Sequence, residues 1–250
     1  MKTRSLLAGV AAVAAVLSCL TAPAVAKTAP TDVQSMIVNG RPASQVYSFM
    51  VSTNISVGGG HYCGGALIKP NWVVSARHCG NPVQVRVGTT NSNSGGTVAR
   101  VRRTIHHPGN GVDVSLIELA TSVPQTPIQI AATSGPAGTA TRIIGWGQTS
   151  PVPGNGRTTQ LMELDTSIVP DNRCPVGRNP ATDLCTNNPD GNAGACYGDS
   201  GGPQIKRVNG IWQLVGATSG SGNGNELCAT GPSLYMDVPA VSSWIRSYTG

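Results

Sequence analysis

The sequence Gly198-Asp-Ser-Gly-Gly-Pro203 places a single serine among glycines. Glycines on both sides let the backbone approach a substrate closely and adopt turns that other residues cannot. The string also fits the pattern G-x-S-x-G, which exposes a nucleophilic serine in the α/β-hydrolases. An ordinary glycine-rich turn is the alternative, so the rest of the chain must decide which fold carries this serine.

The order of histidine, aspartate and serine along the chain excludes two arrangements of a catalytic serine. An α/β-hydrolase needs its base histidine after the serine, and no histidine follows Ser200. The subtilisin order needs an aspartate before the histidine, and the only aspartate before His78 is Asp32, in an expected pro-segment. The remaining order is histidine, aspartate, serine.

His78 is the candidate base because a strand-like run that starts at Trp72 leads to it and Cys79 pins the residue after it. The other histidines are expected to have structural or turn roles: His61, His106 and His107.

Asp113 is the candidate orienting acid. It lies between two valines at the head of an apolar strand, residues 114–119. A carboxylate buried there needs a strong partner, and an imidazole N–H is one. The other aspartates considered have polar, exposed-looking neighbours: Asp165, Asp171, Asp183 and Asp190.

The composition excludes several classes of protein. Charged residues make up 11% of the 250, which is too few for a coiled coil or a disordered charged tail. Of the net charge of +6, residues 1–36 carry +2. The remainder is too mild for a nucleic-acid partner, and the arginines at 100, 102 and 103 are expected to form a solvated face.

The N-terminus has the features of an export signal. Lys2 and Arg4 precede an apolar run, residues 6–20, and a small-x-small cleavage pattern ends at Ala26. The apolar run is shorter than the roughly 20 residues that span a bilayer. Residues 1–26 are therefore predicted to be a signal peptide and residues 27–36 a pro-segment. The mature protein is expected to be secreted and extracellular, with no membrane association.

Removal of the signal peptide discards Cys19 and leaves six cysteines: Cys63, Cys79, Cys174, Cys185, Cys196 and Cys228. An even number in an exported chain predicts three disulfides, whose connectivity stays open. A metal site is the alternative, because His61 and His78 lie close to cysteines in the sequence. Disulfides are favoured, since no C-x2-C pair occurs and the compartment is oxidising.

Short β-type runs recur from residue 37 onward, separated by clusters of glycine, proline, asparagine and serine. The expected strands are residues 47–54, 65–68, 72–75, 83–87, 98–105, 114–118, 141–145, 162–168 and 212–217. Strands at this spacing predict an all-β barrel or sandwich. Residues 122–138, rich in proline and glycine, are expected to connect two halves, and only residues 238–248 have helical periodicity.

From residue 37 to the C-terminus the chain resembles the chymotrypsin/trypsin family of serine endopeptidases. The motifs that carry the resemblance are Ile37-Val-Asn-Gly40, His61-Tyr-Cys-Gly-Gly-Ala-Leu-Ile68, Trp72-Val-Val-Ser-Ala-Arg-His-Cys79, Asp113-Val-Ser-Leu-Ile-Glu-Leu119, Gly145-Trp-Gly147, Gly198-Asp-Ser-Gly-Gly-Pro203 and Ser243-Trp-Ile245. The resemblance implies an all-β fold of two six-stranded antiparallel β-barrels with a C-terminal α-helix. Residues 37–250 would form the protease domain, with the barrels joined near residues 122–138.

The resemblance also implies roles for individual residues. Ser200 would be the nucleophile, and His78 the general base and then the general acid. Asp113 would hold the imidazole tautomer and stabilise the imidazolium. The backbone N–H groups of Gly198 and Ser200 would form the oxyanion hole.

Activation is implied by the same resemblance. A freed ammonium of Ile37 would pair with Asp199 and shape the oxyanion loop, so the precursor would be an inactive zymogen. The disulfides implied are Cys63–Cys79, Cys174–Cys185 and Cys196–Cys228. The loop at residues 80–100 lacks any carboxylate, so a calcium loop of the kind some relatives carry is not expected, and neither a metal nor another cofactor is.

The expected specificity pocket has no charge at its floor. Its residues are Gly194, Ala195, Ser219, Ser221 and Ser233, and Gly194 stands where trypsin-like members have an aspartate. Cleavage is therefore predicted after uncharged residues, apolar or small ones, and the Met36–Ile37 junction fits this preference. One alternative is cleavage after Arg or Lys, through Asp190 or Glu226.

A second alternative is a non-catalytic binding protein on the same scaffold. The expected partners are polypeptide substrates and protein protease inhibitors, and the expected state is a monomer.

Overall fold

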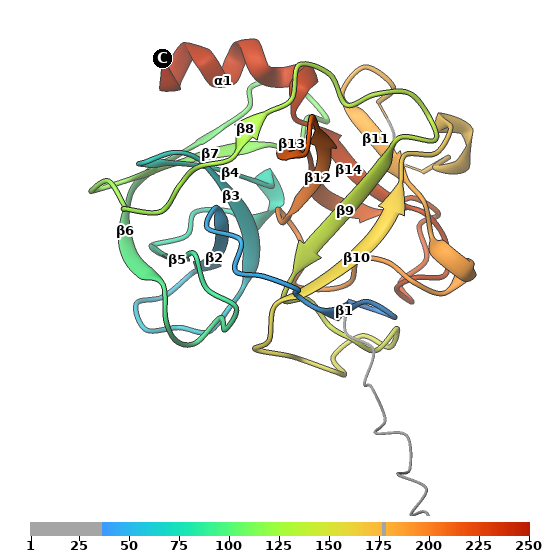
Figure 1. The fold of residues 1–250 in the computed structure, drawn as a ribbon, viewed down its shortest axis with the longest axis horizontal. Coiled ribbons are helices and arrows are strands. Elements are labelled where there is room, and N and C mark those ends of the chain that lie inside the picture. Colours follow the sequence, from blue (N-terminus) through green and yellow to red (C-terminus); the bar gives the residue numbers. More distant parts are fainter. Residues whose placement is uncertain (1–36, 177–178) are drawn as a thin grey trace, which may run out of the picture. The chain divides into compact units, whose positions relative to one another are not determined.

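The computed structural model describes residues 37–176 and 179–250 (Figure 1). The predicted signal peptide and pro-segment lie outside the described residues. The described chain is mostly β with a single short α-helix near the C-terminus, which confirms the expected fold class. No helix in this part of the chain has the length and apolar character needed to cross a membrane.

The first half is a closed antiparallel barrel of six strands. They are β2 (Met50–Asn54), β3 (Cys63–Lys69), β4 (Trp72–Ser75), β5 (Gln84–Val87), β6 (Thr97–His106) and β7 (Ser115–Leu119). The hydrogen-bonded order is β2-β3-β4-β7-β6-β5. Strand β5 illustrates the pattern of a barrel strand. Its two valines are buried while Gln84 and Arg86 are half-buried, which is the alternation expected of a strand with one face toward the core.

The second half is an eight-stranded sheet. Its strands are β1 (Arg41–Pro42), β8 (Gln129–Ile130), β9 (Ala140–Gly145), β10 (Met162–Ser167), β11 (Asp183–Thr186), β12 (Pro203–Val208), β13 (Ile211–Ser221) and β14 (Ser233–Asp237). The order is β1-β10-β9-β12-β13-β14-β11, and β8 pairs in parallel with β13. The sheet therefore has two strands more than expected. Both β1 and β8 contain two residues, too few to show the alternation by which strands are predicted.

Nine strands have the positions expected from the sequence, with shifted ends. Strands β11, β12 and β14 were not expected, because proline and small polar residues break their apolar pattern. Strand β13 continues to Ser221, through a stretch of small residues that no propensity rule favours. Residues 122–138 lie between β7 and β9 and supply β8.

The C-terminal helix is shorter than predicted. A 3-10 turn at Pro239–Val241 precedes α1 (Ser242–Thr249). Ile245 is buried, and the ring of Trp244 packs edge-on against the ring of His107, with centroids 4.7 Å apart. The helix thus covers the end of strand β6.

The described chain contains three disulfides: Cys63–Cys79, Cys174–Cys185 and Cys196–Cys228. The first ties the start of β3 to the turn that carries His78. The third connects the loop before Ser200 to the segment that leads into β14.

Candidate active site

His78 and Asp113 are brought together by the pairing of β4 with β7. The two strands end in register, with Ser75 opposite Ser115. His78 follows β4 on a 3-10 turn, Arg77–Cys79, and Asp113 lies two residues before β7. One carboxylate oxygen accepts the His78 backbone N–H at 2.9 Å, and the other lies 2.7 Å from His78 Nδ1. The carboxylate therefore fixes both the backbone and the ring of the histidine.

Asp113 is also held by residues of the second half. Ser219 of β13 donates its hydroxyl to Asp113 Oδ2 at 2.7 Å, and the Asp113 N–H lies 2.9 Å from Met236 Sδ of β14. Burial alone would raise the pKa of Asp113, but the hydrogen bonds from His78 and Ser219 outweigh it and hold the pKa below its usual value. Asp113 is therefore ionised at neutral pH and suited to stabilise an imidazolium.

Ser200 sits in a loop whose glycines are required by close contacts. Its carbonyl accepts the N–H of Gly64 at 2.7 Å, which attaches the loop to the first barrel. Gly201 has φ of +75°, and a Cβ there would lie 2.3 Å from Ser75 Oγ and 2.6 Å from a backbone oxygen. Only glycine satisfies both the conformation and the space.

The loop before Ser200 is held by a half-buried histidine. His61 Nε2 lies 2.8 Å from the Gly198 carbonyl, and Nδ1 lies 2.8 Å from Ser52 Oγ. Burial lowers the pKa of His61 to about 4, so the ring is neutral at neutral pH. A neutral ring that donates from Nε2 to the carbonyl accepts from Ser52 at Nδ1. His61 therefore has a structural contact, as the sequence indicated.

Asp199 is fully enclosed beside Ser200. Its two carboxylate oxygens accept the N–H groups of Gly147 at 2.8 Å and of Cys196 at 2.9 Å. A Cβ on Gly145 or Gly147 would lie within 2.3 Å of those oxygens, so the glycines make room for the carboxylate. Burial raises the pKa of Asp199 to about 7, although the hydrogen bonds from the two N–H groups act to lower it. None of the ion pairs between described residues includes Asp199.

We expect the stability of the uncleaved chain to fall as the pH rises from about 4 to about 7. A carboxyl whose pKa is raised on folding binds its proton more tightly in the native state, so ionisation favours unfolding across that window. The slope from this one group approaches about 1.4 kcal/mol per pH unit. Urea unfolding at several pH values should show this slope in the wild type and lose it in Asp199→Asn. Equal slopes in the two proteins would contradict the assignment.

A cavity of about 320 Å³ opens beside His78 and Ser200. Four of the expected pocket residues line it: Ala195, Ser219, Ser221 and Ser233. The fifth, Gly194, lies beside Ser233, whose Oγ is 3.3 Å from where a Cβ on the glycine would be. Glu226 is exposed and is the only carboxylate among the lining residues that the structure describes, and Asp190 is not among them.

A second hollow, of about 440 Å³, shares His78, Tyr197 and Ser200 with the first. Ser200 therefore lines both hollows. Arg157 lines the second hollow and is exposed.

Sequence reasoning missed several contacts of the site. Met236 gave no signal, because a methionine in a strand is an ordinary core residue, and Ser219 was assigned to the pocket alone. Asp183 was expected to be exposed but is buried at the start of β11, where it accepts the N–H of Asn179 at 2.6 Å. That expectation was wrong because β11 itself was not recognised.

One group of potential metal ligands occurs among the described residues: Cys63, His78 and Cys79, whose ligand atoms lie within 4.8 Å of one another. Both sulfurs belong to one disulfide, so neither is a thiolate. The three residues lie close together because the Cys63–Cys79 disulfide fixes the turn that carries His78.

The chain is similar in sequence to known proteins of one family. The sequence pattern of the trypsin family matches residues 37–245. A trypsin of Sarcophaga bullata is 32% identical over 94% of this chain and 96% of its own length. A trypsin of Saccharopolyspora erythraea is 34% identical over 82% of this chain and 94% of its own length. A trypsin of Sus scrofa is 31% identical over 87% of this chain and 97% of its own length.

The chain combines a β-barrel and a second β-sheet with a glycine-flanked serine and an aspartate-bound histidine that line one cavity, an arrangement that fits the trypsin-like serine endopeptidases. The chain belongs to the trypsin family. It is a hydrolase that acts on polypeptides.

Proposed function

We propose that the protein cleaves peptide bonds through an acyl-enzyme formed on Ser200. His78 takes the proton of the serine hydroxyl as it attacks the carbonyl and returns it to the leaving amine, while Asp113 stabilises the imidazolium. The observation that carries this proposal is that Asp113 binds both the ring Nδ1 of His78, at 2.7 Å, and its backbone N–H, at 2.9 Å. His78 and Ser200 in turn line the same two hollows. Turnover of a peptide substrate by variants of these residues tests it.

The oxyanion that forms in each step would be stabilised by the N–H groups of Gly198 and Ser200. Gly198 has φ of +97°, and a Cβ there would lie 3.2 Å from the backbone of Gly147. These limits favour glycine at a position that, in the proposed mechanism, would turn its N–H toward the substrate. The requirement for glycine thus supports a role for the backbone N–H of Gly198.

Activation would occur by cleavage before Ile37. Ile37 is buried and has φ of +43°, a conformation that is costly for a β-branched residue. Cleavage removes the preceding peptide bond and with it the constraint on φ. It also creates an ammonium that can pair with the buried carboxylate of Asp199, whose pKa would then fall. Both effects favour the inserted terminus in the processed chain.

The pocket favours an uncharged side chain before the scissile bond. No described carboxylate lies at its floor, where Gly194 and Ser233 meet, and the exposed side chain of Glu226 is free to stay in water. A cation in this cavity would be desolvated without a partner, which is costly. Apolar or small side chains therefore fit best.

Profiling on a peptide library should show cleavage after apolar or small residues, favoured over Arg and Lys by about 10²-fold or more, since several kcal/mol of unpaired burial correspond to that ratio. Dominant cleavage after Arg and Lys would contradict the prediction. The relatives named as trypsins make that outcome the main alternative, and Glu226→Gln and Asp190→Asn would then identify the carboxylate responsible.

The protein is proposed to act outside the cell as a monomer, after loss of residues 1–26 and 27–36. Protein protease inhibitors that present an extended loop are proposed as partners, because the two hollows on either side of Ser200 suit such a loop. A non-catalytic binding role is the second candidate, and a processed chain with no turnover would favour it.

A further inference from the structure

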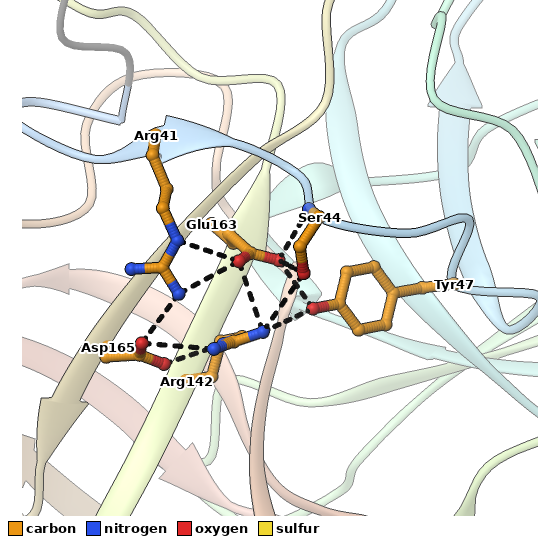
Figure 2. A network of polar contacts seen from close by, with 6 residues as sticks. All are labelled: Arg41, Ser44, Tyr47, Arg142, Glu163 and Asp165. Atoms are coloured by element: carbon orange, nitrogen blue, oxygen red, sulfur yellow. Dashed lines mark hydrogen bonds and ion pairs between the residues drawn. The ribbon is translucent and has the colours of Figure 1, made fainter.

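Glu163 of β10 is a fully buried carboxylate that gathers donors from a segment far away in the sequence (Figure 2). We call this segment, residues 37–47, the N-terminal strap. Glu163 Oε1 accepts Arg41 Nε at 3.0 Å. Glu163 Oε2 accepts the backbone N–H and the hydroxyl of Ser44, each at 3.1 Å, and the hydroxyl of Tyr47 at 2.6 Å. One carboxylate thus binds three residues of the strap.

The network around Glu163 is balanced in charge. Arg142 of β9 lies 3.1 Å from Glu163 and 2.9 Å from the Tyr47 hydroxyl. Asp165 binds both guanidinium groups, Arg142 at 2.7 and 3.0 Å and Arg41 at 2.6 Å. Two carboxylates therefore face two guanidinium groups, as Figure 2 shows. Such full pairing makes a buried charge tolerable.

The strap leads directly to the proposed activation site. Strand β1 pairs with β10, with Arg41 opposite Glu163. Ahead of it, the carbonyl of Val38 accepts the N–H of Gly194, the glycine at the floor of the specificity pocket, at 3.1 Å. Only residues 37–40 lie between the network and the terminus that cleavage would free. Four residues reach at most about 14 Å, so the network limits where this terminus can go.

We propose that Glu163 is a positioning residue for activation: by clamping the strap it keeps the freed ammonium of Ile37 at a high effective concentration beside Asp199. This inference rests on the proposed activation mechanism. A tethered group binds more tightly because its tether is already ordered. Loss of the clamp should lower the fraction of processed enzyme with an inserted terminus, while the chemistry of His78 stays the same.

The charged state of the clamp is constant over the pH range in which the terminus titrates. Burial would raise the pKa of Glu163, but hydrogen bonds, that of Tyr47 foremost, hold it below its usual value. Burial would also raise the pKa of Asp165, but its hydrogen bonds to Arg142 and Arg41 hold it below its usual value. Burial raises the pKa of Tyr47, and hydrogen bonds to Asp165 raise those of both arginines. No member of the clamp therefore changes charge between about pH 5 and 10.

The alkaline limit of activity consequently reports on the terminus. A free α-amino group has a pKa of about 7.7–8.0, and insertion beside a carboxylate raises the apparent value. The groups that face Asp199 are the N–H groups of Gly147 and Cys196 and the phenol of Tyr235, whose pKa burial raises far above this range. A tenfold weaker insertion moves the alkaline midpoint down by about one pH unit.

The test is the pH profile of kcat/KM for the processed enzyme and its Glu163→Gln variant. We expect the alkaline midpoint of the variant to fall by about one pH unit, with the acidic limb and the KM at neutral pH unchanged. The initial rate of labelling by an organophosphorus probe should fall about tenfold at pH values above both midpoints, where the inserted fraction is proportional to the insertion equilibrium constant. An unchanged alkaline midpoint would overturn the proposal.

Glu118→Gln is the matched control. Glu118 is also a buried carboxylate that pairs with two arginines, Arg102 and Arg103, but it lies in the first barrel away from the strap. We expect its alkaline midpoint to match the wild type. An equal shift in this control would show that loss of any buried ion pair has the effect, and it would overturn the specific role of Glu163.

Tyr47→Phe provides a milder variant in case Glu163→Gln does not fold. It removes one hydrogen bond between the strap and Glu163, and we expect a smaller shift in the same direction; no shift in a folded Tyr47→Phe protein would then count against the clamp.

A wild type that is equally active with Met36 retained would instead refute the proposed activation mechanism, on which the clamp depends. The two failures are therefore distinguishable.

Discussion

Replacement of Ser200 by alanine is expected to lower turnover by about 10⁶-fold, and replacement of His78 by about as much. The two residues act as a unit, because the hydroxyl is a poor nucleophile without the base and the base has no function without the hydroxyl. Asp113→Asn should cost about 10⁴-fold, since the amide offers the wrong hydrogen-bonding partner to His78 Nδ1. Steady-state turnover of a chromogenic peptide by the processed chains is the measurement.

Ser219→Ala is the informative comparison, because Ser219 binds the same oxygen of Asp113 but takes no proton in the proposed mechanism. We expect it to lose far less activity than Asp113→Asn. Near-wild-type turnover in Asp113→Asn would point to another acid and refute the assignment.

A chain that begins at Ile37 should be active, and a chain that retains Met36 should be weaker by at least about 10²–10³-fold, the cost of losing one oxyanion donor. With Met36 in place the nitrogen of Ile37 is an amide and carries no charge, so Asp199 keeps a pKa of about 7 and is only partly ionised at neutral pH. The carboxylate then cannot hold the loop that carries Gly198 by an ion pair. N-terminal sequencing of the active species, combined with turnover, checks this.

Asp199→Asn in the processed chain serves as the control for this prediction. It removes the acceptor of the ammonium and should lose activity to a similar degree. An active species that begins at Lys27 would contradict the mechanism, as would full activity in the chain with Met36.

The sequence was most informative at positions where backbone conformation or burial allows few residue types. The glycines around Ser200 were expected to permit unusual turns, and Gly201 indeed has no room for a Cβ. Asp113 was expected to need an imidazole partner because it starts an apolar strand, and the structure has His78 in that position. These positions could be predicted because each rests on a backbone or burial constraint that a few adjacent residues reveal.

The rest depends on contacts between distant segments. Glu163 lies in an unremarkable strand, and its partners Arg41 and Tyr47 are more than 110 residues away in the sequence. Nothing local distinguishes it from a surface glutamate. Strand β14 and buried Asp183 were missed for the same reason, because their burial comes from neighbouring strands rather than from their own pattern.

The central claim is that Ser200 is a nucleophile activated by His78. The most direct test treats the processed chain with an organophosphorus serine probe and locates the adduct by peptide mass spectrometry. We predict one adduct per chain, on Ser200, with none in Ser200→Ala and very slow labelling in His78→Ala. A processed, folded chain that remains unlabelled, or that carries the adduct on another residue, would contradict the account.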